Sequence, residues 1–439
     1  MLNKQPYKGT RDFFPHDKRI LDYIFERMRC TAESFGYESY DGPLLEDIEL
    51  YKAKSGEELI NEQIYDFTDR GERHVAIRPE MTPTLARMVA QIHREYSKPL
   101  RWYSIPNLMR YEKPQKGRVR EHWQFNCDIF GAPGRMGEVE ILDIAISLLK
   151  SFGANSSQFE VLINDRQVID VLFTKILKLN SEESTKMIKL IDRSKKLTPE
   201  LLEKQIAEFL KENKSVTIFY DYLKLQNFEE LFTFLDNHGH IEAVLNLKSI
   251  MTPLQALGLI EFIKFDPTIA RGLDYYTGIV FEIFDKNPEN RRAICGGGAY
   301  ADLLKIFDEP SLPGVGLGLG DVTLLDFLKT HKLLPEKITQ PHNDIQLCTD
   351  QADSINTLLS ISDKLRKSGL KVIVSLDVVK FNKVFKDSEK NGADFVGLIG
   401  ENEKNNCTIQ IKEMKNRIQK EFKLNDINDL IIAIKKKSL

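Results

Sequence analysis

The chain has 439 residues, of which 42 % are hydrophobic and 29 % charged, and its formal net charge is −3. This composition fits a globular protein of two or three domains and excludes the binding of nucleic acid through net charge alone. No hydrophobic run approaches the ~20 residues that cross a bilayer, and the N-terminus lacks the hydrophobic stretch of a secretion signal, which predicts a cytoplasmic protein.

The five cysteines are odd in number and far apart, and no two of them form a CxxC pair. A disulfide framework needs paired cysteines, and a thiolate zinc site needs closely spaced ones. The sequence therefore predicts neither, and no structural metal is expected.

The predicted elements divide the chain into three parts. The first part mixes helices and strands, the middle part is helical, and in the last part strands and helices alternate. A helix is predicted over residues 17–35, where hydrophobic residues recur at helical spacing before Gly36. Between about 165 and 255 glycine is rare and helical spacing returns, which predicts a helical insertion. Strand character resumes at 277–284, and a turn-rich linker follows at 334–343. Beyond it we predict a small α/β module with a mixed sheet and a closing helix, its strands and helices alternating near residues 344–349, 353–368, 371–376, 378–391, 394–400 and 407–412.

The segment 78–88, which reads RPEMTPTLARM, places polar residues at alternate positions before a predicted helix. Glu80 is suited to a cationic amine. Thr82 is equally suited to capping the helix, with Pro83 in its first turn.

The most polar segment covers residues 110–131. Within 110–120 one acid, Glu112, accompanies five basic residues: Arg110, Lys113, Lys116, Arg118 and Arg120. Pro114 and Gly117 predict a turn between two strand-like arms. Arginines presented from both arms suit a polyphosphate, although a solvated hairpin tip explains the charge equally well.

The second arm continues with Gln124, Asn126 and Asp128 at alternate positions, which puts them on one face of a strand. Hydrophobic residues occupy the other face. Such a strand is suited to lining a polar pocket.

Two later segments are candidates for ligand contact. Arg271 precedes Tyr275 and Tyr276, and a buried cation in that setting needs an anionic partner. The run Gly296, Gly297 and Gly298 allows the backbone to approach a ligand closely.

Glycines at 314, 316, 318 and 320 share one face of a predicted strand. Their spacing is never three, which excludes the dinucleotide fingerprint GxGxxG, and the chain has no P-loop. We predict a flat floor for a nucleotide, with Asp321 capping the helix that follows.

These segments resemble those of class II aminoacyl-tRNA synthetases, and among them the histidyl-tRNA synthetases. KGTRDFFP resembles the opening of the family, YDGPLLEDIELY with Pro43 resembles motif 1, residues 110–131 resemble motif 2, and RGLDYYTGIVFE resembles a histidine-specific signature. The resemblance covers nearly the whole chain. It implies an α+β catalytic domain with an antiparallel sheet flanked by helices, in two parts at 1–164 and 256–332. A helical insertion at 165–255 separates these parts, and a C-terminal α/β anticodon-binding domain follows at 333–439.

The resemblance also implies a reaction and its partners. A homodimer would activate histidine with ATP and Mg²⁺ to histidyl adenylate and transfer it to tRNA(His). ATP would be bound by Arg110, Glu112, Arg118, Gly316, Gly318 and Gly320. Histidine would be bound by Glu80, Thr82, Gln124, Asp128, Tyr275 and Tyr276, with Asp128 and Tyr276 on either side of the imidazole. Arg271 and Arg110 would be catalytic, and the turn at Gln115 and Lys116 would approach the acceptor end of the tRNA.

Three positions depart from the family pattern. Asp128 stands where the family usually has glutamate, no arginine follows Gly298, and Thr323 replaces the motif 3 arginine that holds the γ-phosphate. Arg118 and the arginines at 291 and 292 are the candidates to supply that charge.

The alternative is a non-catalytic relative, similar to the regulatory subunit of ATP phosphoribosyltransferase. The predicted C-terminal domain and the retained histidine-pocket residues argue against it. The same C-terminal domain argues against a plain nucleotide-binding module.

Overall fold

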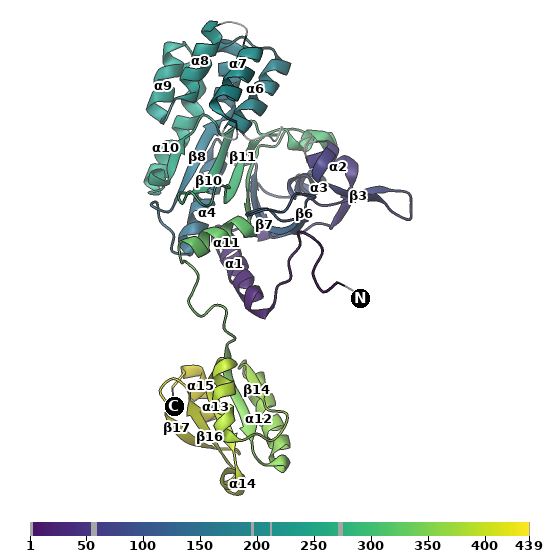
Figure 1. The fold of residues 1–439 in the computed structure, drawn as a ribbon, viewed down its shortest axis with the longest axis vertical. Coiled ribbons are helices and arrows are strands. Elements are labelled where there is room, and N and C mark those ends of the chain that lie inside the picture. Colours follow the sequence, from purple (N-terminus) through teal and green to yellow (C-terminus); the bar gives the residue numbers. More distant parts are fainter. Residues whose placement is uncertain (1–2, 54–58, 195–196, 211–212, 271–274, 439) are drawn as a thin grey trace. The chain divides into compact units, whose positions relative to one another are not determined.

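The protein is described by a computed structural model that covers residues 3–53, 59–194, 197–210, 213–270 and 275–438. The chain forms two compact units, of which the first comprises Met1–Asp12 and Leu21–Leu334, and the second Phe13–Ile20 and Pro335–Leu439 (Figure 1). Apart from residues 13–20, the insertion and both parts of the predicted catalytic domain fall within the first unit, so the four-segment division stays a prediction.

A nine-stranded sheet forms the centre of the first unit. Its order is β1-β5-β7-β12-β11-β10-β8-β9, and β6 pairs with β7. The strands are β1 (Glu38–Ser39), β5 (Leu100–Ser104), β6 (Asn107–Met109), β7 (Glu121–Phe130), β8 (Phe159–Asp165), β9 (Ile263–Phe265), β10 (Ile279–Asp285), β11 (Cys295–Tyr300) and β12 (Gly314–Gly320). Neighbours from β5 to β8 run antiparallel, while β1 and β9 join the edges in parallel. The predicted antiparallel sheet is confirmed, with a parallel pair at each edge.

Helices flank this sheet, because burying the hydrophobic face of each helix against the sheet is favourable. They are α1 (Pro15–Ser34), α3 (Thr82–Ile92), α4 (Met136–Ser151) and α11 (Asp321–Thr330). The helix α4 packs tightly on the sheet, since a Cβ atom built on Gly137 would lie 2.9 Å from Val315 and 3.3 Å from Ile129. Among the described residues, no helix is both long and hydrophobic enough to cross a membrane.

A second, smaller sheet has the order β2-β4-β3. The elements around it are β2 (Leu45–Asp47), α2 (Ile48–Lys52), the π-helix η1 (Leu59–Gln63), β3 (Tyr65–Thr68) and β4 (His74–Ile77). It leads directly into the segment before α3.

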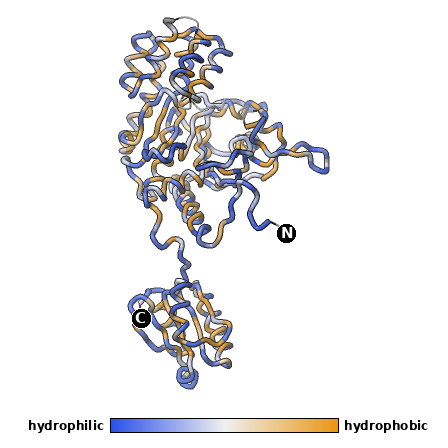
Figure 2. The backbone as a smooth tube through the Cα atoms, in the orientation of Figure 1, coloured by the Kyte–Doolittle hydropathy of each residue, from blue (hydrophilic) through white to orange (hydrophobic). Residues whose placement is uncertain are grey.

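The predicted helical insertion consists of helices. They are α5 (Arg166–Val171), η2 (Leu172–Ile176), α6 (Ser181–Arg193), α7 (Pro199–Phe209), α8 (Asn213–Leu223), α9 (Phe228–Asn237), η4 (Ile241–Val244) and α10 (Leu245–Ala256). In Figure 1 helices α6 to α9 form a group of their own. Hydrophobic and hydrophilic residues alternate along them (Figure 2), as expected of helices that share a small core.

The second unit contains a five-stranded sheet of order β14-β13-β15-β16-β17. Its elements are β13 (Asn343–Thr349), α12 (Ile355–Lys367), β14 (Val372–Val374), α13 (Phe381–Lys390), β15 (Ala393–Ile399), α14 (Glu401–Asn406), β16 (Thr408–Glu413), β17 (Gln419–Lys423) and α15 (Asn428–Lys436). Parallel and antiparallel pairs both occur, so the predicted mixed sheet is confirmed. All five cysteines of the chain are free thiols.

Candidate active site

The strand register places the glycines of β11 and β12 beside the polar residues of β7. Two rows of directly opposed residues cross the sheet: Asp128, Gly316 and Gly298 in the first, and Asn126, Gly318 and Gly296 in the second. Opposed residues of neighbouring strands point to the same face. The glycines and the polar side chains therefore share one face, which we call the glycine face.

Two of these glycines make room for side chains of the neighbouring segments. A Cβ atom built on Gly316 would overlap Oδ1 of Asp128, and one built on Gly298 would lie 2.6 Å from the ring of Tyr276. Real Cβ atoms do not approach that closely. The carboxylate of Asp128 and the ring of Tyr276 thus lie over adjacent glycines in one row.

Asp128 has a phenol partner that the sequence reasoning missed. The hydroxyl of Tyr300 donates a 2.5 Å hydrogen bond to Oδ1 of Asp128, and the placing of Asp128 and Tyr276 on either side of an imidazole stays a prediction. Burial raises the pKa of Asp128 to about 7, and the bond from Tyr300 opposes this shift. Tyr300 follows Gly298 by two positions, so strand alternation alone places it on the glycine face. Tyr275 joins the group, with its ring centroid 4.7 Å from that of Tyr276 and 6.0 Å from that of Tyr300.

The glycine face is open at its other end. A Cβ atom on Gly318 would lie 2.9 Å from the amide of Gln124, but the nearest atom to one on Gly320 is Oγ1 of Thr323 at 3.6 Å. Gly318 and Gly320 are also the two glycines of β12 that are not fully buried. Open space therefore lies over Gly320, and the amide end of the Gln124 side chain lies over Gly318, whereas Gly316 is covered by Asp128.

Residues 110–120 form an irregular loop between β6 and β7 rather than two strand-like arms. The loop closes on a turn, where the N–H groups of Gln115 and Arg118 donate 3.0 Å and 2.8 Å hydrogen bonds to each other's carbonyl. Nε of Arg118 forms a 2.9 Å ion pair with Glu112. Gln115 and Lys116 are exposed at the turn, and their contact with tRNA stays a prediction.

The start of this loop is fixed to the segment before α3. Nε of Arg110 donates a 2.8 Å hydrogen bond to the carbonyl of Pro79, next to the buried Glu80. Thr82 is the first residue of α3, whose N-cap is Met81 with no side-chain hydrogen bond. The alternative role of Thr82 as a helix cap is therefore wrong, because the residue lies inside the helix.

Arg120 stabilises the loop from within. Its guanidinium lies 4.0 Å from the ring centroid of Tyr111 and donates a 3.0 Å hydrogen bond to the hydroxyl of Tyr7. Its backbone N–H donates to the carbonyl of Gly9 at 2.7 Å. The N-terminal segment is thereby attached to the base of the loop.

Asp321 does not cap α11, which corrects the prediction. The N-cap is Gly320, without a side-chain hydrogen bond. The buried carboxylate of Asp321 instead forms a 2.8 Å ion pair with Arg11 and accepts a 3.0 Å hydrogen bond from the backbone N–H of Trp123. Arg11 thus connects the opening segment of the chain to α11 and β7.

His122 alternates with Gln124 and the other polar residues of β7, and so belongs to the same face. Burial, together with the nearby charges of Arg110 and Arg11, lowers the pKa of His122 to about 3. The imidazole is therefore neutral at physiological pH. Arg271, predicted to be catalytic, lies outside the described residues.

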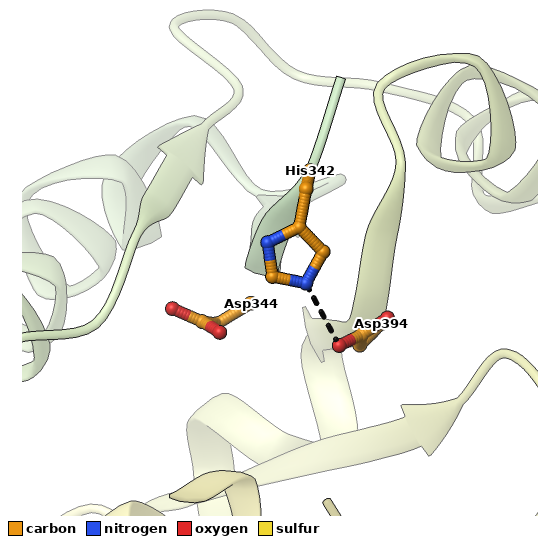
Figure 3. A group of neighbouring side chains, drawn as sticks. All are labelled: His342, Asp344 and Asp394. Atoms are coloured by element: carbon orange, nitrogen blue, oxygen red, sulfur yellow. Dashed lines mark hydrogen bonds and ion pairs between the residues drawn. The ribbon is translucent and has the colours of Figure 1, made fainter. Parts of the chain in front are cut away.

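A histidine and two aspartates, side chains of the kinds that bind metal ions, lie close together in the second unit. One ligand atom from each of His342, Asp344 and Asp394 lies within 4.8 Å of the others (Figure 3). Both carboxylates are already engaged, because Asp394 accepts from His342 at 3.2 Å and from Lys437 at 3.0 Å, and Asp344 accepts from the backbone N–H of Lys371 at 2.6 Å. We assign no metal to this partly exposed ion-pair group.

The chain is similar to known proteins over nearly its full length. The family model "Histidyl-tRNA synthetase" matches residues 9–322, and the model "Anticodon binding domain" matches residues 345–434. The chain is 40 % identical to a histidine–tRNA ligase of Leptospira biflexa over 97 % of this chain and 96 % of that protein. It is 33 % identical to the chloroplastic/mitochondrial histidine–tRNA ligase of Arabidopsis thaliana, over 97 % of this chain and 86 % of that protein.

A solved structure has the same fold. The crystal structure of a histidyl-tRNA synthetase from Nostoc sp. PCC 7120 superimposes with a TM-score of 0.81 at 24 % identity, covering 100 % of both chains. The full-length match includes the C-terminal unit.

Proposed function

Because the chain belongs to the histidyl-tRNA synthetase family, we propose that it activates histidine with ATP and transfers it to tRNA(His) from the glycine face. It is a ligase of this family. The observation that carries the assignment is the row in which Asp128, held by Tyr300, lies beside Tyr276 over two glycines. A carboxylate and phenols together supply the acceptor and the donors that an imidazole ring needs.

Histidine is proposed to bind with its ring at this row. Asp128 accepts from one ring nitrogen, and Tyr276 and Tyr275 complete the pocket. Gln124, together with Glu80 and Thr82 of the segment before α3, is proposed to hold the α-amino group.

ATP is proposed to lie over the open end of the glycine face, at Gly318 and Gly320. Arg110 and Glu112 are proposed to bind the α-phosphate and the adenine, and Arg118 the outer phosphates. ATP enters with Mg²⁺, which prefers carboxylate oxygens. Glu282 fits this requirement, since the register places it opposite Gly296 on the same face. The ion would add positive charge at the phosphates.

The reaction needs no enzyme nucleophile. A carboxylate oxygen of histidine attacks the α-phosphorus, the bond from this phosphorus to the bridging oxygen breaks, and pyrophosphate leaves. Negative charge on the phosphoryl oxygens is stabilised by fixed cations. Arg110, fixed to Pro79, is proposed for this role together with Arg271, whose assignment rests on the resemblance.

The remaining partners are also proposals. The turn at Gln115 and Lys116 would contact the acceptor end of the tRNA, and the second unit, which matches the anticodon-binding model, would contact the anticodon. Homodimer formation and a cytoplasmic location follow from the resemblance and the sequence. The regulatory-subunit alternative is not favoured, because the chain spans 96 % of a histidine–tRNA ligase.

Pyrophosphate exchange into ATP tests the proposal. We expect exchange by the full chain that depends on histidine, followed by charging of tRNA(His). Exchange that is absent, or equal with and without histidine, in a folded protein would contradict it.

A further inference from the structure

The position of the family's motif 3 arginine carries no charge in this chain. Thr323 occupies it, in the first turn of α11, and Oγ1 of Thr323 lies 3.4 Å from the carbonyl of Ile294. Thr323 is thus packed against the residue just before β11. The loop between β10 and β11 ends there, and Arg292 lies in that loop two residues before Ile294.

Arg292 extends from this loop to the loop at residues 110–120. Its Nε donates a 3.1 Å hydrogen bond to the carbonyl of Lys116, and Nζ of Lys116 donates a 3.3 Å bond to the carbonyl of Glu289. Gly117 has a positive φ of 73° and leaves space for the arginine, because a Cβ atom there would lie 2.7 Å from Cδ of Arg292. The two loops are therefore packed together at Arg292.

Two arginines are concentrated near one carboxylate at this contact. Arg118 pairs with Glu112. Burial and the charge of Arg118 lower the pKa of Arg292, while Glu112 raises it, so all three groups are close enough to interact. One acid cannot neutralise two guanidinium groups. The excess positive charge favours an anion, and guanidinium matches phosphate oxygens in geometry.

We propose that Arg292 binds the outer phosphates of ATP together with Arg118, and so supplies the positive charge that Thr323 does not. This inference rests on the proposed function, because the ligand is the ATP of the adenylation reaction. Arg292 reaches the phosphates from the β10–β11 loop instead of from α11. A bound triphosphate would then also hold the two loops together.

The test compares Arg292→Ala with Arg70→Ala, a change at an exposed arginine in the turn between β3 and β4. In histidine-dependent pyrophosphate exchange we expect Arg292→Ala to lower kcat/KM for ATP by about 100-fold to 1,000-fold, the usual effect of removing one charge-stabilising donor. The KM for histidine should change less than threefold. Arg292→Lys should recover part of the loss, and Arg70→Ala should behave as the unmodified protein.

Equilibrium binding separates phosphate contact from a structural role. Arg292→Ala should weaken binding of ATP at least tenfold while AMP, which lacks the outer phosphates, binds as before. Equal weakening of both nucleotides would overturn the inference. If Arg292→Ala fails to fold, Arg292→Gln serves in the same comparison.

A rescue experiment restores the family's charge at its usual place. The double change Arg292→Ala and Thr323→Arg is expected to recover at least tenfold of the lost kcat/KM. If the unmodified protein exchanges pyrophosphate and Arg292→Ala has the same kcat/KM for ATP, this inference alone is overturned. Unmodified protein without histidine-dependent exchange would instead contradict the proposed function, and the ATP and AMP comparison would still decide the role of Arg292.

Discussion

The hydroxyl of Tyr300 donates a 2.5 Å hydrogen bond to the buried carboxylate of Asp128. Tyr300→Phe removes this bond and leaves the rest of the ring in place. We expect the KM for histidine to rise about 10-fold to 100-fold, because a hydrogen bond to a charged group contributes about 1.5–3 kcal/mol. Pyrophosphate exchange at varied histidine measures this effect. The KM for ATP is the internal control, and equal changes in both constants would contradict the placement of Asp128 in the histidine pocket.

Asp128 should also give the ligand-free protein a pH-dependent stability. Because burial raises the pKa of Asp128 to about 7, the folded state holds this proton more tightly than the unfolded chain. Between about pH 4 and pH 7 the folded state binds more protons, so the contribution of Asp128 to the free energy of unfolding falls as pH rises, by up to about 1.4 kcal/mol per pH unit. Asp128→Asn lacks this dependence.

Denaturation of both proteins from pH 4.5 to pH 8 measures the difference. The stability of the unmodified protein relative to Asp128→Asn should decline with rising pH and level off above about pH 7. Every other titrating group, His122 included, is present in both proteins, so its contribution to the pH dependence cancels in the comparison. Parallel curves would show that Asp128 has an ordinary pKa.

Gly316 and Gly320 offer a matched pair of substitutions on the same face of β12. Gly316→Ala forces its Cβ into Oδ1 of Asp128, whereas Gly320→Ala meets nothing closer than 3.6 Å. We expect Gly316→Ala to destabilise the protein by about 1–3 kcal/mol, as overpacking does, and to impair the use of histidine. Gly320→Ala should leave the melting temperature nearly unchanged and raise the KM for ATP. If Gly320→Ala were less stable than Gly316→Ala, the glycine face would not be open at Gly320.

The Arg11–Asp321 ion pair should contribute to stability because Asp321 is only 2 % exposed. Arg11→Met leaves that carboxylate buried without its partner, at an expected loss of about 3–5 kcal/mol. Arg94→Met is the control, since Arg94 pairs with Glu309 while 70 % exposed, and such a pair contributes less than about 1 kcal/mol. Urea denaturation measures the free energy of unfolding of both variants. Equal losses would show that burial of Asp321 does not matter.

Much of the fold could be predicted from periodicity. The helix predicted over residues 17–35 is α1 (Pro15–Ser34), and the strands predicted at 344–349 and 394–400 are β13 and β15. The strand β17 was missed because it is a charged edge strand with one buried residue, Phe422, and so has no hydrophobic alternation. A strand is recognised in a sequence by hydrophobic residues at alternate positions, which form its buried face. Since β17 buries a single residue, this signal is missing.

The site was predictable where strand alternation applied and less so where it did not. Strand alternation predicted one polar face on β7 and one glycine face on β12, and the register shows that both lie on the same face of the sheet. Asp321 was misassigned because Arg11, its partner, is 310 residues away in sequence, and no local signal joins them. The turn predicted within 110–120 is present, but strand-like arms do not form on either side of it, because the Arg120 guanidinium stacks on the ring of Tyr111 inside the loop.

The attachment of the N-terminal segment to Arg120 and Asp321 has a practical consequence for handling the protein. Tyr7, Gly9 and Arg11 each bond to residues at the base of the 110–120 loop or at the start of α11. An affinity tag fused ahead of these residues, or a trimmed first dozen residues, would disturb a region that lies far along the chain. Purification handles therefore belong at the other terminus.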